Sequence, residues 1–237
     1  TNVTLKAGDV VIDSDADSVH RFDDDSETTE TVVDVLESVS TIAGVALSDA
    51  TSVITFGEGT RIEANSLSVD SFAGAEAEVT TVGTAIGVTV AIANPTSTID
   101  IQKDVMINVE GDVDLNSHAL STISAKGYTV SLGPGTGGSP VDVTVTVTKS
   151  DIESKVNLAD GASIHATGSV TLDASMRKSM NTSAMSGAYE NGAAGISLAL
   201  SFSESNVFAY ADGDITAGGT INVTAESNAP KNDTAAS

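Results

Sequence analysis

The sequence contains no cysteine and no tryptophan, and only 10 of its 237 residues are lysine or arginine. Without cysteine there is no disulfide framework, thiolate metal site, iron–sulfur cluster or thiol nucleophile. The 33 acidic residues leave a formal net charge of −23, which argues against binding to nucleic-acid phosphates or anionic lipid but is compatible with a basic partner. We therefore expect no nucleic-acid partner.

Aromatic residues make up 3% of the chain, whereas hydrophobic residues make up 40%. This balance excludes a disordered acidic tail and indicates a core of small aliphatic side chains. No run approaches the roughly 20 apolar residues that cross a bilayer, and the first residues lack the basic and apolar regions of a signal peptide. We expect no membrane insertion, and we interpret the sequence as a piece excised from a longer chain.

An internal repeat organises the sequence, because four stretches align and a fifth, partial copy opens the chain. The aligned stretches are residues 44–71, 87–118, 141–175 and 195–227, and the partial copy is residues 3–18. Repeats of a few tens of residues are typical of solenoids and arrays. The prediction is one domain over residues 1–237, built of about four and a half repeats.

Each repeat alternates β-branched and polar residues with a period of two, which is the pattern of half-buried strands. We expect residues 26–44 to be strand as well, although a serine followed by glutamates leaves a helix as the alternative. The aliphatic residues at matched positions are predicted to face one common interior; they are Val143, Val145, Ile196, Leu198, Val170, Leu172, Ile221 and Val223.

Recurring strands with short turns and no helices are compatible with a sandwich, a propeller or a parallel β-helix. A β-helix needs few aromatics, because ladders of small aliphatics fill its narrow core. The predicted fold is therefore all-β, a right-handed parallel β-helix (β-solenoid) fragment. A repeat of about 50 residues exceeds one three-stranded coil of roughly 20 to 25, so we expect two coils per repeat and nine or ten coils in all.

Glycine and asparagine recur at one matched corner, where Asn65 takes the place of Gly111 and Gly168. Both residue types tolerate positive φ, so the sequence predicts a left-handed backbone at Gly111 and Gly168. A second matched corner contains Asp160 and Gly161, with residues 57–59 in the equivalent place of an earlier copy.

The cadence of residues 160–175, followed by residues 195–207, resembles the repeats of giant secreted bacterial exoproteins. These are the filamentous haemagglutinin-like and leukotoxin-like adhesins. The resemblance implies a right-handed parallel β-helix, export from the cell, display at the surface and adhesion. The resemblance does not identify any functional residue in this chain, because the matching positions have structural roles.

An acidic cluster at residues 13–27 is the one candidate cofactor site. Asp13, Asp15 and Asp17 alternate, and Asp24 falls at the twelfth position of a calcium-type loop that begins at Asp13. The sixth position is Ser18 where such a loop needs glycine, and the twelfth is Asp rather than a bidentate Glu. We therefore weigh calcium binding against a solvated acidic loop, and the second interpretation is favoured.

No catalytic residue is predicted. The three histidines are far apart in sequence, and His165 occupies a position that is Glu63, Asn108 and Thr216 in other copies, which indicates an outward-facing side chain. Residues 133–140 are rich in glycine but lack the lysine and helix of a phosphate-binding loop.

The sequence predicts a structural, adhesive shaft segment of a large extracellular bacterial surface or secreted protein, with no catalysis. A host or neighbouring-cell surface ligand and lateral self-association are the partners considered. The alternatives are a carbohydrate-active β-helix of the polysaccharide lyase or hydrolase type and a self-assembling filament subunit. A lyase or hydrolase requires carboxylates that converge in one groove with a basic residue.

Overall fold

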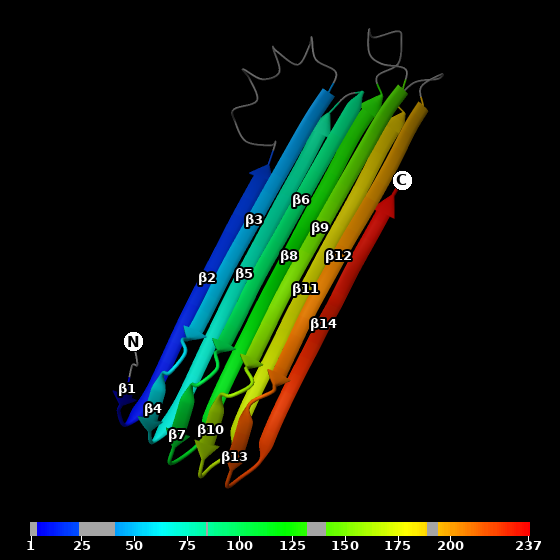
Figure 1. The fold of residues 1–237 in the computed structure, drawn as a ribbon. Helices are drawn as coiled ribbons and strands as arrows, with labels where there is room; N and C mark the ends of the chain where they lie inside the picture. Colours follow the sequence, from blue (N-terminus) through cyan, green and yellow to red (C-terminus); the bar gives the residue numbers. More distant parts are fainter. Residues whose placement is uncertain (1–3, 24–40, 84, 132–140, 189–193) are drawn as a thin grey trace.

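The computed structural model describes residues 4–23, 41–83, 85–131, 141–188 and 194–237, which form strands and turns and no helix (Figure 1). The strands belong to three sheets. The short sheet contains β1 (Thr4–Lys6), β4 (Arg61–Ala64), β7 (Met106–Val109), β10 (Ser163–Ala166) and β13 (Asp214–Ala217). The first long sheet contains β2 (Asp9–Asp23), β5 (Ser66–Gly83), β8 (Val113–Ser131), β11 (Val170–Ala188) and β14 (Ile221–Ala236). The second long sheet contains β3 (Thr41–Phe56), β6 (Ile86–Ile101), β9 (Val141–Leu158) and β12 (Ala194–Ala211).

Every strand pairs in parallel with its counterpart one coil away. One coil consists of a short strand, a long strand of the first sheet and a long strand of the second sheet that returns to the short-sheet end (Figure 1). The predicted class, an all-β parallel β-solenoid, is confirmed. The prediction of two coils per repeat is wrong, because each repeat is a single wide coil whose long strands reach 19 residues.

We call the stack of coils the blade, and the part of the blade next to the short sheet the near half. The near half has a core of large aliphatic side chains. Its buried residues come from all three sheets and include Leu67, Ile99, Ile107, Leu115, Ile164 and Leu172. Three sheets enclose a wider space than two, so this end can accommodate Ile and Leu. The short sheet thus determines where the aliphatic core sits.

A continuous row of serine hydroxyls crosses the interior and closes the near half. The serine row joins Ser14, Ser52, Ser71, Ser97, Ser117 and Ser154, alternating between the two long sheets, with hydroxyl-to-hydroxyl distances of 2.8 to 3.1 Å. Most of these hydroxyls also donate to a backbone carbonyl of the preceding serine. Since buried polar groups are costly unless bonded, this chain of hydrogen bonds makes serine acceptable there.

Beyond the serine row, in the far half, only the two long sheets remain and they approach closely. Threonine hydroxyls meet across the gap, as in the 2.5 Å contacts of Thr81 with Thr89 and of Thr129 with Thr144. A Cβ added at Gly127 would lie 2.6 Å from Thr146 Oγ1. The far interior therefore takes mainly Ala, Gly, Ser and Thr.

This close approach overturns half of the predicted interior. Val170 and Leu172 are fully buried, and Ile221 and Val223 continue their ladders on β14, where they are 49% and 45% exposed because no further coil covers them. On the second long sheet the prediction was wrong: Val143, Val145, Ile196 and Leu198 face outward, and Thr144, Thr146 and Thr148 between them are buried. The alternating pattern correctly predicted that these strands have two different faces. The face with the larger aliphatic residues was wrongly assigned to the interior.

The predicted corner glycines also have a different role. Gly111 and Gly168 do stack at matching positions, but neither has positive φ, so that prediction was wrong. They are glycine because consecutive coils touch there: a Cβ on Gly168 would lie 2.7 Å from the Gly111 carbonyl carbon. Positive φ occurs instead at the second corner, with φ of 80° at Gly161. Residues 26–40 and 133–140 lie outside the described residues.

Candidate functional site

The outer face of the second long sheet carries a regular array of aliphatic side chains in its far half. The strand register places them in rows across the four strands, and we call this set the apolar array. Its rows are Ile86, Val143, Ile196; then Val88, Val145, Leu198; then Val45, Val90, Val147, Leu200; and finally Leu47, Ile92, Lys149, Phe202.

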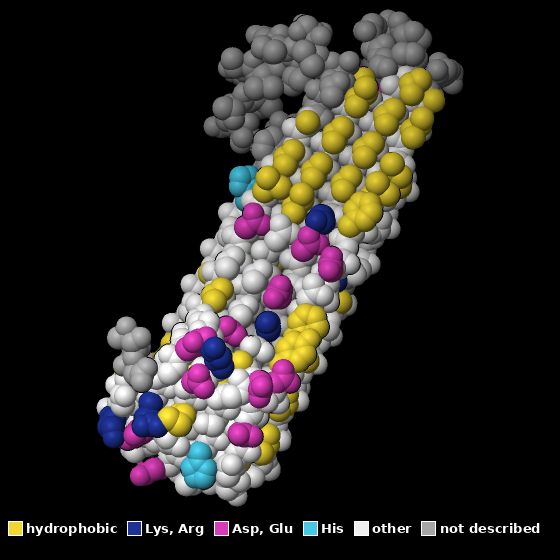
Figure 2. Space-filling view, in the orientation of Figure 1, with side chains coloured by type: hydrophobic (Ala, Val, Ile, Leu, Met, Phe, Trp, Pro, Cys, Tyr) yellow, Lys and Arg dark blue, Asp and Glu magenta, His cyan; other side chains and the backbone are white. Residues whose placement is uncertain are grey.

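The apolar array is open to solvent. Leu47, Ile196, Leu198 and Phe202 are 54%, 56%, 45% and 53% exposed, and the inner strands contribute half-buried valines between them. Figure 2 shows these side chains as one block at the far end of the blade, whereas acidic and basic residues are scattered over the near half of the same face. The largest contiguous apolar patch on a soluble protein is often an interaction site.

The array follows from the packing behind it. A strand alternates its side chains between two faces, and the far interior is filled mainly by small side chains, with a few larger ones such as Ile123 and Met180. On the second long sheet, Ala, Ser and Thr occupy most of the inner positions of the far half, and the bulkier Val, Ile and Leu side chains lie on the outer face. The result is an aliphatic surface above a core of Ala, Ser and Thr.

Charged residues border the array on the side toward the near half. The next row across the same strands is Asp49, Asn94, Asp151 and Glu204. The amine of Lys149 lies 2.6 Å from Asp151 Oδ2, and this hydrogen bond raises the pKa of Lys149 above its ordinary value. The lysine stem lies within the array while its charged end is held by the border row.

The calcium candidates lie elsewhere, on β2 at the other long sheet. Asp13, Asp15 and Asp17 are exposed on the outer face of that strand, so the segment is extended where a loop was expected. Alternate residues of a strand are about 6.6 Å apart, which arranges the carboxylates in a line. Asp24 lies outside the described residues, and calcium binding stays an untested alternative to a solvated acidic segment.

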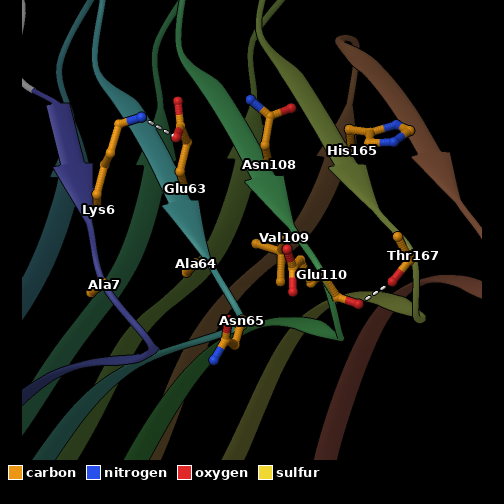
Figure 3. A pocket seen from close by; sticks show the side chains of 10 residues that line it. All are labelled: Lys6, Ala7, Glu63, Ala64, Asn65, Asn108, Val109, Glu110, His165 and Thr167. Atoms are coloured by element: carbon orange, nitrogen blue, oxygen red, sulfur yellow. Dashed lines mark hydrogen bonds and ion pairs between the residues drawn. The ribbon is translucent and has the colours of Figure 1, made fainter.

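A shallow groove of about 410 Å³ crosses the short sheet and the corner beside it (Figure 3). Lys6, Glu63, Asn108 and His165 point outward from neighbouring strands at matched positions, as the sequence predicted for His165. Lys6 Nζ pairs with Glu63 Oε2 at 2.5 Å, and their side chains remain 68% and 39% exposed. The groove brings carboxylates, a lysine and a histidine to one surface without excluding water.

A second hollow of about 320 Å³ lies on the outer face of the first long sheet. Phe72, His118, Arg177 and Glu226 contribute to its lining, and His118 Nδ1 lies 2.5 Å from Ser175 Oγ. Among the described residues no three His, Asp or Glu side chains are close enough to share a metal ion. The structure places His118 and His165 on different sheets.

The chain matches no protein-family model, no curated protein and no solved structure. The resemblance to large bacterial adhesins therefore stays a prediction. No helix in the described part of the chain is long and apolar enough to cross a membrane.

Sequence reasoning missed the apolar array, because it assigned these aliphatics to the core. A signal was present: the residues between Val143, Val145 and Val147 are all threonine, and those between Val88, Val90 and Ile92 are Thr89 and Ala91. Small residues matched on one face across repeats indicate a close sheet-to-sheet approach, which leaves the larger side chains outside.

Proposed function

We propose that the chain is a structural segment of a large extracellular bacterial surface or secreted protein, acting as a shaft that presents an adhesive face. The apolar array is the observation that carries the proposal. It is flat, regular and solvent-exposed, and it lies on strands fixed by parallel pairing through four coils. A rigid scaffold that holds an aliphatic surface in water is suited to contact with another surface.

The acidic composition fits this role. A net charge of −23 keeps a stacked β protein soluble, and charges on the outer faces discourage unwanted pairing of sheet edges. The absence of cysteine is compatible with a chain that crosses membranes unfolded. Because the charges oppose association elsewhere, the apolar array is the part of the described surface best suited to it.

A carbohydrate-active role is the second candidate, and the groove on the short sheet favours it. Glu63, Glu110, Lys6 and His165 line that groove. However, Lys6 is already paired with Glu63, and both side chains are open to water. Glycoside cleavage requires carboxylates placed on both sides of one bond in a site that positions the sugar. The apolar array is the stronger feature.

Immunoelectron microscopy on cells of the source organism tests the proposal. Antibodies raised against the 237-residue chain should label intact cells or secreted material. Labelled particles should be ribbons about 60 Å wide, because long strands of some 18 residues rise about 3.3 Å per residue. Label confined to lysed cells, or activity on polysaccharides that is abolished by Glu63→Gln, would contradict it.

A further inference from the structure

We propose that the apolar array binds a second copy of itself, so that two chains pack face to face through their second long sheets with the strands running in opposite directions. The inference rests on the adhesive part of the proposed function, but it concerns a property of the isolated chain and does not depend on where the parent protein lies. The two-fold axis runs along the direction in which the coils stack, so each strand meets its own counterpart.

The spacing of the array is the first argument for a second copy. Parallel pairing spaces the columns by about 4.8 Å, and alternation spaces the rows by about 6.6 Å. Two sheets pack face to face about 10 Å apart, and their side chains meet in register over several rows only when the two faces have the same spacings. Another copy of this face supplies the same lattice without any adjustment of its backbone.

The charged border sets the direction of packing. Asp49, Asp151 and Glu204 lie on one side of the array only. If the strands of two copies ran in the same direction, these acids would face one another, which is destabilising. With opposite directions the two acidic rows lie at opposite ends of the contact, and the acidic near halves of two chains of charge −23 point away from each other.

Lys149 is compatible with this arrangement. It stands in the row next to the acidic border and lies opposite the Val143 row of the second copy. Its stem covers aliphatic surface while its amine stays on Asp151, 2.6 Å away at the edge of the contact. No charge is therefore buried without a partner.

The area of the array predicts a weak complex. The array has fourteen positions of about 32 Å² each, or about 450 Å² on each copy. The total of about 900 Å² is slightly below the usual range of specific interfaces. We expect a reversible dimer with a dissociation constant on the order of 100 μM. Because two acidic chains repel, the dimer should strengthen several-fold between 50 and 500 mM NaCl.

Sedimentation equilibrium at about 5 to 500 μM protein tests the self-association. The wild-type chain should shift from monomer toward dimer, and the double variant Val147→Glu, Leu200→Glu should weaken the association at least tenfold. Val11→Glu is the matched control, because Val11 is 72% exposed on the other long sheet; it should dimerise like the wild type. Thermal melts verify that each variant is folded. Loss of dimer in the control, or a wild-type chain that stays monomeric at all concentrations and salt levels, overturns the proposal.

A spin label tests the direction. The chain has no cysteine, so Thr51→Cys, on an exposed outer position of β3, accepts one label per copy. Strands in opposite directions place the two labels about 45 Å apart, whereas strands in the same direction place them within about 20 Å. The shorter distance overturns the proposed packing.

A chain that is monomeric in solution but binds phosphatidylcholine vesicles through the array overturns the proposal in favour of a lipid surface. Neither result changes the labelling of intact cells, which tests the proposed function separately.

Discussion

The near and far halves of the blade share the same long strands but are packed in opposite ways. In the near half, Ile, Leu and Val fill an interior enclosed by three sheets, and the outside carries charged and polar side chains with a few exposed hydrophobic ones such as Val11 and Tyr210. In the far half, mainly Ala, Ser and Thr fill a thin interior, and most aliphatics of the second long sheet face water. The distance between sheets, rather than the hydrophobicity of a strand, decides which face becomes the core.

Buried polar residues follow the same division. Among the described residues every buried Ser, Thr, Asp or Lys lies in the serine row or in the far half. Hydrogen bonds across the gap make this interior tolerable, but they leave less hydrophobic stabilisation per residue than the near core provides. The far half therefore depends on close fit and on hydroxyls that are mostly hydrogen-bonded, with Thr146 Oγ1 an exception among the described residues, and the near half depends on aliphatic burial.

The largest expected difference between the halves comes from shortening one leucine in each. Leu172→Ala removes a fully buried side chain from the near core and should lower the free energy of unfolding by about 2 to 5 kcal/mol. Leu198→Ala acts on a 45% exposed side chain and should cost less than about 1 kcal/mol. Urea denaturation measures both. Equal losses would mean that Leu198 is a core residue, as the sequence alone suggested.

Adding one methyl group to the far interior should cost somewhat less. A Cβ at Gly127 would lie 2.6 Å from Thr146 Oγ1 and 2.8 Å from Thr144 Cγ2, so Gly127→Ala should destabilise the chain by about 1 to 3 kcal/mol through overpacking. Gly57→Ala is the control, because a Cβ at Gly57 meets nothing within 4 Å. A Gly127→Ala variant as stable as the control would show that the sheets can separate easily.

Asp142 gives the far half a pH dependence. Its carboxylate is buried; Oδ1 accepts a hydrogen bond from the Ala85 N–H at 2.9 Å, and Oδ2 has no partner among the described residues. Burial raises the pKa of Asp142 despite that bond. The folded chain therefore binds this proton more tightly than the unfolded chain, so the stabilisation is present in acid and is lost as pH rises through the folded pKa.

Asp142→Asn should accordingly stabilise the chain at neutral pH by about 1 kcal/mol, since an amide can still accept from Ala85 and carries no charge. The gain should shrink as the pH falls toward the unfolded pKa of about 3.9. Urea denaturation at several pH values between 4 and 8 measures it. A gain that grows in acid would have the wrong sign and would contradict this account.

At Lys178 we expect the free energy of unfolding to change with pH in the opposite direction, by a similar or smaller amount. Its side chain is buried in the far half, Nζ donates to Ser203 Oγ and Ser205 Oγ, and burial lowers the pKa of Lys178. A lowered pKa means that the unfolded chain binds the proton more tightly, so stability rises with pH from the folded pKa up to the unfolded value.

Lys178→Met should therefore raise the free energy of unfolding at pH 7 by about 1 kcal/mol, with the advantage disappearing near pH 10. Guanidinium would screen the charges, so urea is the denaturant of choice. Arg177→Met, on an exposed neighbouring position, is the control. Matching pH profiles for the two variants would show that burial of the Lys178 amine has no energetic consequence.

The smallest effect is expected from calcium at the acidic residues of β2. Asp13, Asp15 and Asp17 form a line on β2, so calcium and magnesium at equal ionic strength should stabilise the chain equally and modestly, through screening. Differential scanning calorimetry compares the two ions. A calcium-selective rise in melting temperature that Asp15→Ala abolishes would establish a site and would show that screening is the wrong explanation.

The sequence was sufficient for the fold class, because strand periodicity and repeated corners depend on local chemistry. It correctly placed His165 outside, since that position varies among Glu63, Asn108 and Thr216. The width of the coil was not predicted, because the alternating pattern shows that a segment is a strand but does not show how many residues the strand has before the next corner. The faces of the far half were assigned wrongly because the separation of two sheets is a tertiary property. Gly168 could not be distinguished from a positive-φ corner, because contact between coils leaves no local trace.

Each coil is much wider than the distance that it adds to the stack. Each coil of some 50 residues advances the stack by only about 4.8 Å, while its long strands extend about 60 Å. As a spacer such a fold reaches a short distance for its mass. Every added coil instead contributes nearly 300 Å² to each broad face, extending the same side-chain rows by one column. Lengthening the protein by whole coils thus enlarges a contact surface in fixed increments while its chemistry is kept.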